Sequence, residues 1–173
     1  IGKGTGSFCA VNPLSGRENI LQFSTPKQKK NILVIGGGPA GMEAARTAAE
    51  QGHKVTLCEK SSQLGGRLSL AANMHREQRA FLNYLRAEVQ RLPINIQLNT
   101  HVTPDFVCGQ QPDTVIVATG AIAAPVAFDI HSDAKVIQGS DLDQHLADNT
   151  PQNIAGNTVA VIGSGLLSTI IAE

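Results

Sequence analysis

Residues 31–59 constrain the fold most, because they hold two apolar runs, a glycine-rich turn and an acid at fixed spacings. The first apolar run predicts a buried strand, and the glycines after it open a helical pattern of small residues. A second apolar run follows and ends on Glu59. The turn glycines are Gly36, Gly38 and Gly41. Strand, glycine turn, helix, strand and acid together form the βαβ fingerprint of a dinucleotide-binding unit.

Each glycine of this turn has its own physical purpose. Gly36 permits a tight turn that a Cβ atom would obstruct, and Gly38 lets a pyrophosphate approach the backbone. Gly41 lets the helix pack closely on the strand. The predicted helix begins at Pro39 and Ala40, and its first turn presents unpaired N–H groups and partial positive charge, which favour phosphate binding.

Glu59 and the loop after it supply the second part of the predicted site. Glu59 lies 18 residues past Gly41, where a carboxylate can accept both hydroxyls of an adenosine ribose. Lys60 follows it directly, and a second glycine pair then leads into Arg67 at a predicted helix start. Gly66 of that pair predicts another close approach of backbone and ligand. Arg67 is either a phosphate ligand or ordinary surface charge.

A further signal lies at residues 113–120. Three branched apolar residues at 115–117 predict a strand covered on both faces. The strand ends at Thr119 and Gly120, where a glycine allows close approach at the carboxyl edge of a parallel sheet. Ligands bind at that edge, although an ordinary exit from strand to turn is the alternative.

The stretch between these signals predicts one long helix and one strand. Apolar residues recur at helical spacing over 75–92, and Pro93 ends the pattern. Ile94, Ile96 and Leu98 then alternate with polar residues, which predicts a strand with one buried face.

Composition narrows the possible functions. The 14 Lys and Arg residues balance 14 Asp and Glu, so the zero net charge gives no case for nucleic acid or an acidic membrane as partner. No apolar run approaches the length of a membrane span. Three scattered cysteines make no disulfide framework, which predicts a cytoplasmic protein. No pattern of acids, nucleophiles or histidines identifies a catalytic residue.

A family resemblance rests on Cys9-Ala-Val-Asn-Pro, the Gly16-Arg17-Glu18 that follows, and Val-Ile-Gly-Gly-Gly-Pro-Ala-Gly at 34–41. Together they resemble the multidomain NADH:flavin oxidoreductases of the 2,4-dienoyl-CoA reductase and trimethylamine dehydrogenase type, relatives of old yellow enzyme. The resemblance covers residues 9–173. It implies an upstream FMN-binding (β/α)8 barrel, a [4Fe-4S] cluster, and an FAD- or ADP-binding domain with an inserted NAD(P)H-binding domain.

The resemblance also divides the chain. Residues 1–30 become a linker carrying Cys9, the last of four cluster thiolates whose partners precede residue 1. Residues 31–150 become the N-terminal part of the FAD- or ADP-binding domain, a truncated α/β Rossmann-like three-layer fold with a parallel central sheet. Residues 151–173 become the first strand and helix start of the NAD(P)H-binding domain.

The resemblance also implies roles for individual site residues. Lys60, Gly66 and Arg67 match a loop that touches FAD, Thr119 and Gly120 match a second FAD-contacting motif, and Val102 matches a backbone contact beside the adenine. A second glycine turn begins the NAD(P)H-binding domain. Its residues are Gly163, Gly165 and Ser168, with serine in the third glycine position. The choice between NAD and NADP is not readable.

The function implied is electron relay from NAD(P)H through FAD and [4Fe-4S] to FMN in the parent enzyme. The partners implied are the upstream barrel and the downstream remainder of the chain, and a homo-oligomer is left open. The alternatives are a structural ADP-binding domain, as in trimethylamine dehydrogenase, and a flavoprotein like the glutamate synthase small subunit. Residues 12–18 argue against the last. Since the FAD domain would be incomplete, the isolated chain is expected to bind FAD weakly or not at all.

Overall fold

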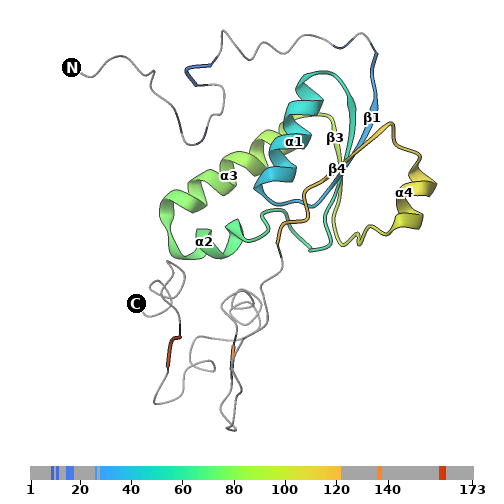
Figure 1. The fold of residues 1–173 in the computed structure, drawn as a ribbon. Coiled ribbons are helices and arrows are strands. Elements are labelled where there is room, and N and C mark those ends of the chain that lie inside the picture. Colours follow the sequence, from blue (N-terminus) through green and yellow to red (C-terminus); the bar gives the residue numbers. More distant parts are fainter. Residues whose placement is uncertain are drawn as a thin grey trace.

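The computed structural model describes residues 9, 11, 15–17, 26, 28–121, 136–137 and 160–162. The described helices and strands form a parallel four-stranded sheet with helices on both sides (Figure 1), which confirms the predicted α/β Rossmann-like class. The elements in chain order are β1 (Asn31–Ile35), α1 (Pro39–Glu50), β2 (Lys54–Cys58), α2 (Leu68–Met74), α3 (Arg76–Arg91), β3 (Ile94–Gln97), α4 (Pro104–Gln110) and β4 (Thr114–Val117).

The strand order, β3-β2-β1-β4, creates a topological switch point. The chain moves outward from β1 through β2 to β3 and then returns to place β4 on the other side of β1. Ile32 of β1 pairs with Thr114 of β4, and Ile35 pairs with Val117. Ligands of open α/β sheets bind at the carboxyl ends of the strands that flank such a point. The fold therefore directs attention to the ends of β1 and β4.

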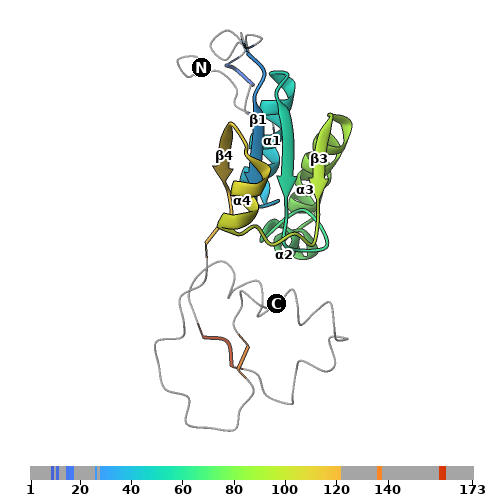
Figure 2. The same cartoon turned by 90° about the vertical axis from the view of Figure 1, so that its right-hand side faces the viewer.

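The core lies between one face of this sheet and the helices α1 and α3, which Figures 1 and 2 show on the same side. The α1 face toward the sheet is built from small residues around the fully buried Met42, so the helix lies close to the strands. The α3 face is larger and aliphatic. The buried core residues of the sheet and these two helices are Ile32, Val34, Val55 and Leu57 of the sheet, Met42, Ala45, Ala48 and Ala49 of α1, and Leu82, Leu85 and Val89 of α3.

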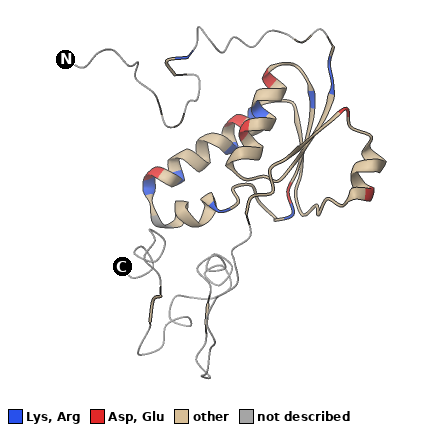
Figure 3. Ribbon diagram, viewed as in Figure 1, with Lys and Arg blue, Asp and Glu red and all other residues tan. Residues whose placement is uncertain are grey.

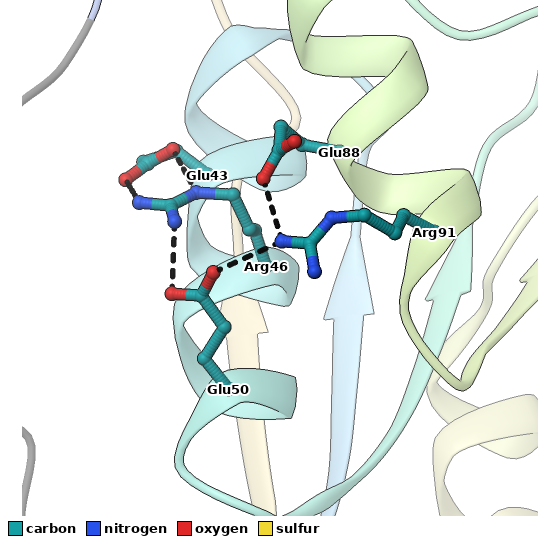
Figure 4. A network of polar contacts seen from close by, with 5 residues as sticks. All are labelled: Glu43, Arg46, Glu50, Glu88 and Arg91. Carbon is teal, nitrogen blue, oxygen red and sulfur yellow. Dashed lines mark hydrogen bonds and ion pairs between the residues drawn. The ribbon is translucent and has the colours of Figure 1, made fainter.

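The two helices are also joined by a chain of charged side chains (Figure 4). Arg46 of α1 is only 5% exposed and donates to both carboxylate oxygens of Glu43 and to Glu50. Arg91 of α3 reaches Glu50 at 3.6 Å and Glu88 of its own helix at 2.9 Å. Charges of both signs therefore alternate along α1 and α3 (Figure 3) instead of forming a field of one sign.

The opposite face of the sheet is covered more thinly, and here one prediction is wrong. The strand at 115–117 exists as β4, but Val115 is 38% exposed and Val117 is 70% exposed. Figure 1 shows α4 on the side of the sheet opposite α1 and α3, and α4 has no buried residue. Among the described strands β4 is also one of the two edge strands. A continuous apolar run predicted burial on both faces, whereas only Ile116 of this run packs against the core, and it is partly buried.

The long helix predicted over 75–92 is confirmed as α3, and the strand after it as β3. The predicted helix start after the second glycine pair is α2, whose N-cap is Arg67. Gly163, Gly165 and Ser168 lie outside the described residues, as does the boundary expected near residue 150. Within the described part of the chain, no helix combines the length and apolar character needed to cross a membrane.

Candidate dinucleotide-binding site

The switch point brings the first glycine of the turn against the end of β4. Gly36 has φ +106°, and its N–H donates to the Cys58 carbonyl oxygen at 2.8 Å. A Cβ atom on Gly36 would collide with the carbonyl oxygen of Ala118 and lie 3.1 Å from the Cα atom of Thr119. Glycine is thus required here by the conformation and by the neighbouring backbone. Thr119 and Gly120, which follow at this edge, are exposed. The structure therefore brings the two separate sequence signals together.

The start of α1 forms the floor of the site. Gly38 is the N-cap of α1, and its carbonyl accepts the Met42 N–H at 2.9 Å. No described atom lies within 4 Å of the place that a Gly38 Cβ would occupy, so this side of the turn is open. The first turn of α1, which begins with Pro39 and Ala40, contains no acidic residue. An open backbone at an uncompensated helix N-terminus fits a pyrophosphate.

Gly41 is required for a close contact, but its partner differs from the one expected. A Cβ atom on Gly41 would collide with the carbonyl oxygen of Gly36. At this position the helix therefore packs on Gly36, the residue that directly follows β1.

Glu59 lies at the end of β2 and faces the same turn. Its side chain is 7% exposed, and its two oxygens accept from backbone N–H groups: Oε2 from Gly37 at 2.6 Å and Oε1 from Ser61 at 2.8 Å. An ionised carboxylate has about four acceptor sites, so both oxygens keep capacity for ribose hydroxyls. The carboxylate is thus held in place by the chain before any ligand arrives.

The sequence alone assigned no role to Gly37, which lies between Gly36 and Gly38 at a position where the glycine motif accepts any residue. Gly37 is buried, and a Cβ atom there would lie 2.5 Å from Leu64 Cδ2 and 3.1 Å from Glu59 Oε2. The available signal was the third consecutive glycine, since the motif itself needs only Gly36 and Gly38 in this stretch.

The second glycine pair packs directly on the first turn. The Gly65 N–H donates to the Gly37 carbonyl oxygen at 2.8 Å, and a Cβ on Gly66 would lie 3.2 Å from the Cα atom of Gly38. Gly66 has φ +53° and is exposed. The close approach predicted for Gly66 is thus made first with the other glycine turn. Arg67 beside it is exposed and forms no side-chain cap on α2.

The remaining predicted residues lie around Glu59. Lys60 is exposed. The Thr100 N–H donates to the Glu59 carbonyl oxygen at 2.8 Å, so the segment leading to Val102 passes beside the acid. Val102 itself is half-buried. The contacts of Lys60 and Val102 with an adenosine stay predictions.

The cysteines have separate environments. Cys58 is a buried core residue, as predicted, and burial raises the pKa of its thiol. Cys9 and Cys108 are exposed. Across the described ranges, no group of three or more His, Cys, Asp and Glu side chains is placed to hold a metal ion. The cluster role of Cys9 stays a prediction.

Comparison with known proteins agrees with this geometry. Residues 30–173 match the family model described as pyridine nucleotide-disulphide oxidoreductase, and the chain belongs to this family. The family consists of oxidoreductases that bind FAD and NAD(P)H.

Curated relatives include reductases and an oxidase. The chain is 35% identical to bilirubin reductase of Mediterraneibacter gnavus over 95% of its own length and 25% of that protein. It is 35% identical to cinnamate reductase of Clostridium sporogenes over 92% of its length and 23% of that protein. It is 41% identical to NADH oxidase of Thermoanaerobacter brockii over 65% of its length and 18% of that protein. The chain therefore spans about a quarter or less of these relatives.

A solved structure shows the same fold. The complex of 2-naphthoyl-CoA reductase with 2-naphthoyl-CoA superposes with a TM-score of 0.64 and 35% identity, over 70% of this chain and 19% of that one. The relatives also include a multifunctional alkene reductase/demethylase of the OYE type from Caballeronia cordobensis. The family resemblance drawn from the motifs is confirmed.

Proposed function

We propose that this chain is the FAD-binding portion of an NAD(P)H-dependent flavin and iron–sulfur oxidoreductase of the 2,4-dienoyl-CoA reductase type. The observation that carries the proposal is the meeting of Gly36 with the Ala118–Thr119 backbone at the switch point. The open backbone of Gly38 and the buried carboxylate of Glu59 flank that point. This is the arrangement that a dinucleotide needs: a phosphate cradle, a close backbone and a ribose acceptor.

Each residue has a binding task. The N–H groups at the start of α1 would receive the pyrophosphate, and Glu59 would accept the ribose hydroxyls. Val102 and Lys60 would border the adenosine, while Arg67, Thr119 and Gly120 would contact the rest of the cofactor. When bound, FAD supplies the redox chemistry, and the protein sets its orientation. No catalytic side chain is assigned.

The wider electron path is part of the same proposal. Cys9 would be the last ligand of a [4Fe-4S] cluster, and Gly163, Gly165 and Ser168 would begin the NAD(P)H site. An upstream FMN barrel and the downstream chain would be the partners. Relatives such as cinnamate reductase and 2-naphthoyl-CoA reductase support a reductase of unsaturated substrates. A cytoplasmic location is proposed from the scattered cysteines.

A structural ADP site is the second candidate, and one observation favours it. Gly38 and Glu59, the parts of the site with defined contacts, address only pyrophosphate and ribose, which ADP and FAD share. The full-length protein should be purified, denatured and its released cofactors separated. FAD together with FMN is the expected result. Release of an adenine nucleotide without FAD would overturn the redox role.

A further inference from the structure

Arg86 of α3 makes a set of contacts that its place on the polar side of an amphipathic helix did not predict. Its Nε donates to the Leu64 carbonyl oxygen at 3.0 Å, and its Nη2 donates to the same oxygen and to Gln63 Oε1 at 3.2 Å. Among the described residues, no carboxylate lies within ion-pair distance of this guanidinium. Its charge is therefore directed at one peptide group of the loop after β2.

That peptide group is bonded at both ends. The Leu64 carbonyl and the Gly65 N–H belong to one peptide unit, and the Gly65 N–H donates to the Gly37 carbonyl oxygen at 2.8 Å. The Gly37 carbonyl in turn belongs to the unit that carries the Gly38 N–H. The peptide bonds of the described residues are trans, and a trans unit points its N–H away from its C=O. The Gly38 N–H consequently points away from Gly65.

A chain of hydrogen bonds thus runs from Arg86 through two peptide groups to the turn that faces the pyrophosphate. Hydrogen-bonded groups in series polarise one another, and a charged donor at one end strengthens the effect. With its carbonyl bonded, the Gly37–Gly38 unit presents a more positive N–H. The same bonds fix the spacing of the two glycine turns. Gly65 is tightly packed, because a Cβ there would collide with Ser69 Oγ.

We propose that Arg86 is a positioning residue for the dinucleotide site, which orients and polarises the glycine turn through the Leu64–Gly65 and Gly37–Gly38 peptide groups. The inference rests on the proposed function, since it concerns the affinity of the same site for a pyrophosphate. It predicts that a side chain of α3, which makes no contact with the ligand, controls phosphate binding at the start of α1.

The matched control is Arg79 of the same helix. Its Nε donates to the Ala72 carbonyl oxygen at 3.0 Å, and its Nη2 to that of Asn73 at 3.4 Å. Both arginines thus tie α3 to backbone carbonyls of the preceding segment. Only Arg86 connects to the glycine turns.

The test compares Arg86→Met, Arg86→Lys and Arg79→Met in the full-length protein after removal of cofactor. FAD and ADP are titrated at fixed ionic strength, and thermal unfolding of each variant is measured alongside. We expect Arg86→Met to weaken both affinities by about tenfold, since a charged hydrogen bond is lost at the end of the series. Arg86→Lys should recover part of the lost affinity. The affinities of Arg79→Met should stay within about twofold of those of the unsubstituted protein, even if its unfolding temperature falls as much as that of Arg86→Met.

Equal affinity of Arg86→Met and the parent would overturn the inference, as would equal weakening by Arg79→Met. Amide exchange of the unliganded protein gives a second measurement: Arg86→Met should accelerate exchange at Gly65, and an unchanged rate would also overturn it. Failure of the parent itself to bind FAD and ADP is a separate result, which would overturn the proposed function and with it this inference.

Discussion

At the scale of single residues, the site depends on contacts that leave no room for a side chain. Gly36 and Gly41 each face a backbone carbonyl oxygen, whereas Gly37 faces the side chains of Glu59 and Leu64. Of the glycines in this turn, Gly38 is the one whose Cβ position has no described atom within 4 Å. The consecutive glycines therefore perform different tasks, and substitutions at each should separate stability from ligand binding.

Gly37→Ala should impair both the stability of the fold and ligand binding. Its Cβ would come within 2.5 Å of Leu64 Cδ2 and 3.1 Å of Glu59 Oε2, so the acid and the loop must move. We expect a loss of about 1–3 kcal/mol in the free energy of unfolding, typical of overpacking, together with weaker ADP binding. Urea unfolding and ADP titration measure the two effects. Gly109→Ala in α4 is the control, because no described atom lies within 4 Å of its Cβ and alanine favours a helix. A Gly37→Ala protein as stable as this control would contradict the packing described.

Gly38→Val should abolish ligand binding with little change in the fold. Its backbone, with φ −72° and ψ −179°, suits any residue, and the new side chain would fill the space left for the pyrophosphate. Loss of a favourable N-cap residue should cost at most about 1 kcal/mol. ADP at 100 times its dissociation constant should stabilise the parent by about 2.7 kcal/mol, and the variant hardly at all. If ADP stabilised Gly38→Val and the unsubstituted protein equally in thermal unfolding, the phosphates would have to bind away from Gly38.

At the scale of elements, α1 is held by its small-residue face on the sheet and by the charge network to α3. Arg46 is the centre of that network, and its hydrogen bond with Glu43 raises the pKa of its guanidinium even further above neutrality. It thus stays charged at every pH at which the protein folds. The partners Glu43 and Glu50 are about a third and a quarter exposed, which limits the energy of each pair.

Arg46→Met should destabilise the protein, because it leaves two carboxylates of α1 facing each other without their cation. We expect a loss of about 1–3 kcal/mol, less than for a fully buried pair since both acids keep contact with water. Arg91→Met, whose side chain is 59% exposed, should cost at most about 1 kcal/mol. Urea unfolding of both variants tests which substitution costs more free energy of unfolding. A larger loss for Arg91→Met would be inconsistent with the burial of Arg46.

The same network makes the stability of the fold depend on pH in the acid range. The hydrogen bond from Arg91 lowers the pKa of Glu88 below its usual range. A carboxyl group with a lowered pKa in the folded state stabilises the fold above its unfolded pKa of about 4.3 and loses this contribution as pH falls through the folded value. Glu88→Gln should therefore flatten the acid limb of the stability curve. Thermal unfolding between pH 7 and about pH 3 measures it, and parallel curves for parent and variant would refute the assignment.

At the scale of the whole molecule, the features that could be predicted from the sequence are those determined by local sequence patterns. The βαβ unit with Glu59 and the helix over 75–92 follow from periodicity and glycine placement, both of which act within one element. The exposure of Val117 does not, because it depends on what covers the sheet. The roles of Gly37 and Arg86 depend on loops that meet across 22 residues or more of sequence. Tertiary pairing decides such contacts.

The position of β4 next to β1 has a consequence for the order of folding. The pairing of Ile32 with Thr114 closes a loop of 82 residues, much longer than those closed by β2 and β3. Contacts so distant in sequence form late, since chain entropy opposes them until the nearer pairs exist. An early species with β1, α1 and β2 would already contain Glu59, but Gly36 would not yet contact the backbone of Ala118 and Thr119. Competence to bind nucleotide should then emerge only as β4 docks, so that nucleotide affinity reports completion of the sheet.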